Sequence, residues 1–124
     1  MAGAKPLYWI GSSLKDLTKF PDEVREVMAY ALDVAVNGGK AANVKPLKGF
    51  NGASVLEIVD DFDGDTYRAV YTVRLANAVY VLHAFQKKST TGSKTSKRDR
   101  DLISKRLAAA ETLHAETRRE GKAR

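Results

Sequence analysis

Residues 66–86, "TYRAVYTVRLANAVYVLHAFQ", decide the fold of this chain. Valine, tyrosine and threonine are abundant in the stretch, and apolar and polar residues alternate, which is typical of β-strands. The short interruption "LAN" divides it into two strands at 66–74 and 78–86. Because so few residues separate them, the two strands are predicted to pair as an antiparallel hairpin.

The predicted sheet continues from this hairpin towards the N-terminus. A third strand, "SVLEIVD" at 54–60, is joined to the hairpin by the turn "DFDGD". A shorter extended piece, "NVKPLKGF" at 43–50, is expected at the edge of the sheet, where Pro46 removes no central ladder bond. We therefore predict an antiparallel sheet of about four strands.

Helices are predicted before and after the strands along the chain. Ser13 is expected to cap a short helix that stops before Phe20-Pro21, and Pro21 opens a second helix with apolar residues at helical spacing. A final amphipathic helix begins near Ser96 and loses its apolar side at about Glu116. The fold class is α+β, with an N-terminal helical hairpin, the sheet and a C-terminal helix. We expect the helices on one face of the sheet and the other face open to a ligand.

The chain of 124 residues is long enough for one domain, which we place at 1–116 with a frayed tail at 117–124. Its N-terminus lacks the apolar core of a secretory signal, and no apolar run approaches the roughly 20 residues that span a bilayer. We expect a cytoplasmic protein that does not contact membranes. Without cysteine, a metal cluster or a glycine-rich phosphate loop, neither a metal nor a cofactor is expected.

The net charge of +6 arises from residues 87–106, which hold eight lysines and arginines against two aspartates, whereas the other charges cancel. Clustered positive charge favours a ligand with a phosphate backbone, because each neutralised phosphate releases counterions. A solvated surface and a site for an acidic protein are the alternatives.

Several basic residues are candidates for this interaction. Period two places Arg68 and Arg74 on one face of their strand, where they either contact a ligand, reach solvent or pair with the aspartates of the preceding turn. Lys87 and Lys88 directly follow the next strand, so a backbone ladder rather than a flexible tail holds them. His83 is a lone strand histidine, a residue that is more often structural than catalytic.

The order of these elements, with the segments "VKPLKGF", "YRAVYTV", "VYVLHAFQKKS" and "TSKRDRDLISKRL", resembles the phage-derived branch of the RelE/HigB family of bacterial toxins. The resemblance extends from about Leu7 to Glu116. It implies a toxin of a toxin–antitoxin pair, held inactive by a helix-turn-helix antitoxin. It also implies an endoribonuclease that cuts mRNA in the ribosomal A site.

The resemblance also assigns site residues. The arginine of the family's strand motif corresponds to Arg68 and the basic pair after the next strand to Lys87 and Lys88, which are the expected catalytic residues. Lys45 and Lys48 correspond to basic residues before the first long strand. The expected RNA-binding residues are Lys45, Lys48, Arg74, Lys94, Lys97 and Arg98.

Many family members have an active-site tyrosine or histidine near the C-terminus, for which this chain has no equivalent after Lys88. Tyr80 and His83 are therefore the next catalytic candidates. An Arg/Lys cluster would stabilise the charge on a pentacoordinate phosphate without a metal, and like charges favour the neutral form of a lysine, which could then act as base or acid. The alternatives are a ParE-type gyrase poison without enzymatic activity and a phage-derived nucleic-acid-binding or regulatory module.

Overall fold

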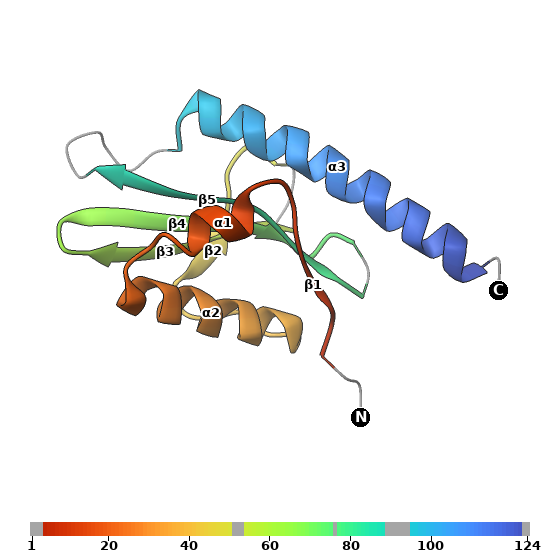
Figure 1. Cartoon of the computed structure of the whole chain (residues 1–124), viewed down its shortest axis with the longest axis horizontal. Helices are drawn as coiled ribbons and strands as arrows, with labels where there is room; N and C mark the ends of the chain where they lie inside the picture. Colours follow the sequence, from red (N-terminus) through yellow and green to blue (C-terminus); the bar gives the residue numbers. More distant parts are fainter. Residues whose placement is uncertain (1–3, 51–53, 76, 89–94, 123–124) are drawn as a thin grey trace.

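The computed structural model describes residues 4–50, 54–75, 77–88 and 95–122. The elements follow in the order β1 (Leu7–Trp9), α1 (Ser13–Leu17), α2 (Asp22–Val36), β2 (Val44–Pro46), β3 (Val55–Phe62), β4 (Asp65–Thr72), β5 (Val79–Lys88) and α3 (Lys97–Lys122) (Figure 1). This arrangement confirms the α+β class, the N-terminal helical pair and the C-terminal helix. None of the helices in the described ranges is both long enough and apolar enough to cross a membrane.

The sheet has five strands in the order β1-β5-β4-β3-β2. The long strands β3, β4 and β5 form consecutive antiparallel pairs, as predicted, and β2 lies at the edge with Pro46. The prediction of about four strands missed β1, in which Leu7 pairs with Val79 in a parallel ladder. Three residues are too few to show an alternating pattern, and the parallel partner lies far away in the sequence.

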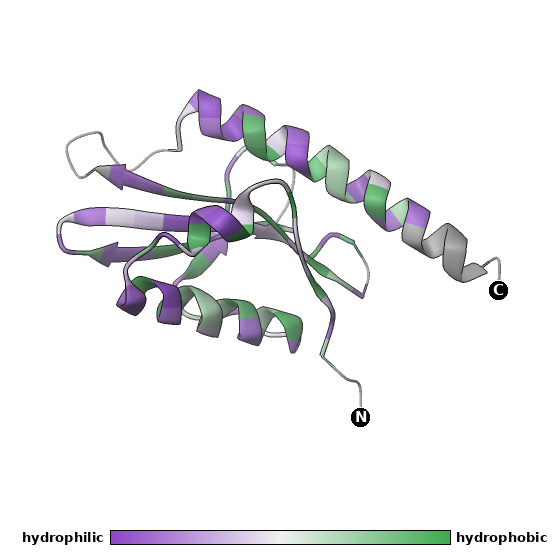
Figure 2. Cartoon of the chain, viewed as in Figure 1, coloured by the Kyte–Doolittle hydropathy of each residue, from purple (hydrophilic) through white to green (hydrophobic). Residues whose placement is uncertain are grey.

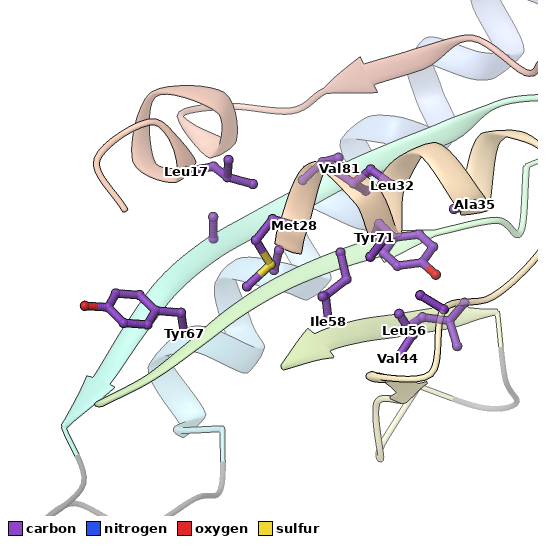
Figure 3. Packing of buried hydrophobic residues seen from close by; sticks show 14 of the residues in the cluster. Leu17, Met28, Leu32, Ala35, Val44, Leu56, Ile58, Tyr67, Tyr71 and Val81 are labelled. Atoms are coloured by element: carbon purple, nitrogen blue, oxygen red, sulfur yellow. The ribbon is translucent and has the colours of Figure 1, made fainter. Parts of the chain in front are cut away.

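The helices cover both faces of the sheet, so the expectation that they cover one face is wrong (Figure 1). One core lies between the sheet and the pair α1 and α2, and it includes Met28, Leu32 and Tyr71 (Figure 3). A second core lies between the sheet and α3, and it includes Leu82 and Ile103. Hydrophobic and hydrophilic residues alternate along α3 because only one side of this helix is buried (Figure 2). The sheet therefore offers a ligand no open face.

The start of α3 matches the prediction, whereas the start of α1 does not. At α3, the Asp99 N–H donates to Ser96 Oγ (3.1 Å), and Ser96 Oγ donates to the Asp99 carboxylate (2.8 Å), so Ser96 caps the helix. At α1, the residue before the helix is Ser12 rather than Ser13, and the buried Ser13 hydroxyl donates to the Val81 carbonyl (3.2 Å). The helix α3 continues to Lys122, beyond the end of its apolar side.

A β-bulge in β5 sets which side chains face α3. Val81 pairs with Tyr71 but His83 pairs with Val70, so Leu82 is an extra residue in β5. Val81 belongs to the core beneath α2, whereas Leu82 and Val70 belong to the core beneath α3. Since paired residues share a face, the bulge brings His83 onto the α3 face directly after Leu82.

Two arginines of α3 form hydrogen bonds with the rest of the molecule. Arg100 Nη1 donates to the carbonyl oxygen of Lys48 (2.5 Å), which lies after β2. Arg106 Nη1 donates to the carbonyl oxygen of Leu82 in the bulge (3.0 Å). Each arginine therefore satisfies a carbonyl group outside the helix, one on each flank of the sheet.

Candidate functional site

Arg68 is part of a buried ion pair. Its Nη1 lies 2.8 Å from Oε2 of Glu57, and the two residues are only 3% and 4% exposed. They are diagonal neighbours on β4 and β3, because Arg68 lies opposite Val59 and Glu57 lies opposite Val70. Arg68 therefore does not reach solvent, and it pairs with Glu57, a carboxylate that the sequence did not indicate as its partner. Burial of a charged residue requires such a partner.

A hollow of about 450 Å³ opens beside this ion pair. It is lined by Lys45, Pro46, Leu47, Lys48, Glu57, Arg68, Thr95 and Arg100. We call it the basic pocket, because it gathers four cationic side chains and one carboxylate. Lys45 lies 3.7 Å from the second oxygen of Glu57 but keeps 61% of its side chain exposed. The positive excess suits an anionic group such as a phosphate.

The basic pocket brings together three of the predicted residues, Arg68, Lys45 and Lys48. Arg100 was not predicted as a site residue. The sequence shows it only as one charge of the basic segment, and no spacing rule relates the first turns of α3 to β4. Its position depends on how α3 packs on the sheet.

Lys87 lines a second hollow, which we call the β5–α3 cleft. Its lining residues are His83, Gln86, Lys87, Ser96, Arg98, Asp99, Asp101, Leu102 and Lys105, around a volume of about 840 Å³. Lys87 lies opposite Thr66, two residues along β4 from Arg68, so Arg68 and Lys87 occupy neighbouring positions on one face. Two of the three predicted catalytic residues, Arg68 and Lys87, are therefore close in the sheet, although they line separate hollows.

His83 joins β5 to the first turn of α3. Its Nε2 lies 2.9 Å from Asp99 Oδ1, and its ring stacks on Phe85 with the centroids 4.6 Å apart. The residue is 7% exposed, and Nδ1 is buried without a hydrogen-bond partner in the described part of the chain. This geometry favours a structural role for His83, since Asp99 already pairs with Nε2 and Nδ1 is buried.

Tyr80 and Arg74 line neither hollow. Tyr80 is fully buried, stacks on Tyr8, and has its hydroxyl 3.4 Å from His114 Nδ1. Burial, with a smaller contribution from Tyr8, raises the pKa of Tyr80. Arg74 lies just after the C-terminal end of β4, and its Nη1 lies 3.5 Å from Oε2 of Glu111 in α3. The structure therefore separates both residues from Arg68 and Lys87.

The remaining predicted residues belong to the start of α3 or to the end of β5. Lys97 and Arg98 are exposed in the first turn of α3, and Arg98 lines the β5–α3 cleft. Lys88 is the last residue of β5, where its backbone pairs with Asp65. Lys94 lies outside the described residues. The described ranges contain no group of three or more His, Cys, Asp or Glu residues that could hold a metal ion.

Comparisons with known proteins agree on the type of fold. A free-state double mutant of the Escherichia coli toxin RelE superimposes with a TM-score of 0.55, at 18% identity over 86% of this chain and 98% of that chain. The isolated E. coli RelE toxin gives a TM-score of 0.54, at 21% identity over 82% and 98%. No curated protein matches significantly. Residues 15–108 match the family described as "Phage derived protein Gp49-like". The chain therefore has the fold of RelE toxins and belongs to the Gp49-like family of phage-derived proteins.

Proposed function

We propose that this protein is the toxin of a toxin–antitoxin pair and a metal-independent endoribonuclease. The basic pocket carries the proposal, because four cationic side chains gather around one hollow on the fold of RelE toxins. The proposed substrate is mRNA bound to the ribosome, which would place the protein in the cytoplasm. A ribosome would supply the alignment that weak acid and base groups cannot supply alone.

The proposed reaction is an attack by a ribose 2′-hydroxyl on the adjacent phosphate. The 2′-oxygen forms a bond to phosphorus and the bond to the 5′-oxygen breaks, which leaves a 2′,3′-cyclic phosphate and a 5′-hydroxyl. The proton of the attacking hydroxyl passes to a base, and the leaving oxygen receives a proton from an acid. In this scheme the basic pocket binds the phosphate as its negative charge grows, and Lys87 or Lys88 at the end of β5 transfers protons.

The proposed partner is a helix-turn-helix antitoxin that covers the basic surface around α3. Opposite charges on the two proteins would speed association at low salt. The rate of association of the purified pair should therefore fall as the salt concentration rises. An unchanged rate would assign the antitoxin to another surface.

The proposed function is tested by inducing the protein in bacteria and following translation and DNA synthesis by incorporation of labelled methionine and thymidine. Translation should stop first, and primer extension should show new 5′ ends in mRNA. Lys87→Ala should reduce these effects, whereas Arg74→Ala, at the other end of β4, should retain them. Early loss of DNA synthesis with intact mRNA would instead support gyrase poisoning, and normal growth would support a regulatory module.

A further inference from the structure

Arg100 enters the basic pocket from α3, whereas Arg68 enters it from the sheet. Its Nη1 donates to the carbonyl oxygen of Lys48, and the backbone of Gly49 lies against the same nitrogen. A Cβ atom at Gly49 would lie 2.6 Å from this Nη1, and the φ angle of Gly49 is +93°. Glycine at this position therefore allows the arginine to approach closely.

The two arginines differ in their charge balance. Arg68 is neutralised by Glu57 at 2.8 Å. In the described ranges, no carboxylate lies within ion-pair distance of Arg100, whose observed hydrogen bond uses a neutral carbonyl group. An anion that enters the pocket must compete with Glu57 for Arg68 but not for Arg100. Of the two arginines of the pocket, Arg100 is therefore the one whose charge no described carboxylate balances.

We propose that Arg100 contacts the scissile phosphate and acts as a catalytic residue of the basic pocket. This inference rests on the proposed function. The bond to Lys48 uses Nη1, so the remaining donors of the planar guanidinium can bind the non-bridging phosphate oxygens. Arg68, held by Glu57, would form the opposite wall. The active pocket is then assembled between the sheet and α3, and it is complete only while α3 stays docked.

The test compares Arg100→Ala with Arg106→Ala. Arg106 is a matched control because it also lies on α3 and also donates Nη1 to a carbonyl group outside the helix, but it lines neither hollow. Single-turnover cleavage of ribosome-bound mRNA and unfolding in urea are measured for both purified variants. We expect Arg100→Ala to lower the cleavage rate about a hundredfold and Arg106→Ala to leave it nearly unchanged, with similar losses of stability.

Arg100→Lys adds a second readout. It retains the charge but loses the planar fork, so it should recover only part of the rate. Equal losses of cleavage rate in Arg100→Ala and Arg106→Ala would show that Arg100 only anchors α3. A normal cleavage rate in Arg100→Ala would overturn the inference, while the proposed function would stand.

If the unmodified protein cleaves no RNA, the proposed function fails, and the contact is tested by binding alone. The probe is a short 2′-O-methyl RNA, which has phosphates but cannot react. Arg100→Ala should weaken its binding at least tenfold and Arg106→Ala should not. Equal binding by the two variants would overturn the contact as well.

Discussion

Arg68→Ala should destabilise this protein strongly, because the substitution leaves the buried carboxylate of Glu57 without its partner at 2.8 Å. Breaking a buried ion pair by removing one partner costs about 3–5 kcal/mol. Lys45, 3.7 Å from the other carboxylate oxygen, can offset part of this cost, so we expect about 3 kcal/mol. The whole free energy of unfolding of such a domain is about 5–15 kcal/mol.

This loss corresponds to a fall in Tm of about 10 °C for a domain of this size. Urea unfolding followed by circular dichroism would measure it directly. Arg74→Ala is the matched control, because it removes an arginine of the same strand region whose partner Glu111 is exposed. Exposed ion pairs contribute about 0–1 kcal/mol, so the control should unfold almost as the unmodified protein does.

If Arg68→Ala lowered the free energy of unfolding by less than about 1 kcal/mol, the buried ion pair would be refuted, because such a small loss is typical of an exposed arginine. A double substitution, Arg68→Met with Glu57→Leu, should recover most of the stability, since it removes both charges and keeps apolar volume. These results also decide how toxicity is read. A variant that loses toxicity because it unfolds gives no information about catalysis, so only a variant of measured stability can test Arg68.

Burial raises the pKa of Tyr71 to about 12, so its contribution to stability is present below the ordinary tyrosine pKa of about 10 and is lost as the pH rises towards 12. Tyr71→Phe should reduce this loss of stability in alkaline unfolding experiments and should be nearly neutral at pH 7. Gly11→Ala should lower urea stability by more than Gly38→Ala. Both have positive φ, but only at Gly11 would a Cβ meet Arg106, at 2.8 Å. Lys87→Ala should lower the rate of RNA cleavage at least tenfold without changing the urea midpoint, and equal rates would remove Lys87 from the proposed mechanism.

The sequence predicted the long strands because their patterns extend over many residues. It also contained a signal against an open sheet face. Val79, Tyr80, Val81 and Leu82 of β5 form a continuous apolar run that is buried on both faces of the sheet, and such runs are typical of strands covered on two sides. The placement of α3 on the second face follows from this pattern.

The site was less predictable, because its geometry depends on contacts between distant elements. Arg68 was identified from its strand motif, but its partner Glu57 depends on the register between β3 and β4. Arg100 depends on the packing of α3. The bulge at Leu82 could not be predicted either, since Val79, Tyr80 and Val81 before it are apolar on both faces of the strand and give no sign of where the alternation shifts.

That bulge has a consequence for insertions and deletions in β5. If Leu82 were deleted, the pairs Tyr71–Val81 and Val70–His83 would become neighbours in a regular ladder, and every other side chain of the strand would keep its face. The loss would be confined to one core side chain and to the carbonyl group that binds Arg106. Deletion of one residue between His83 and Lys87 would instead move every following side chain of the strand to the opposite face. Lys87 would then no longer share a face with Arg68. Loss of one residue is therefore expected to preserve the orientation of the strand end at one position of β5 and to reverse it a few residues later.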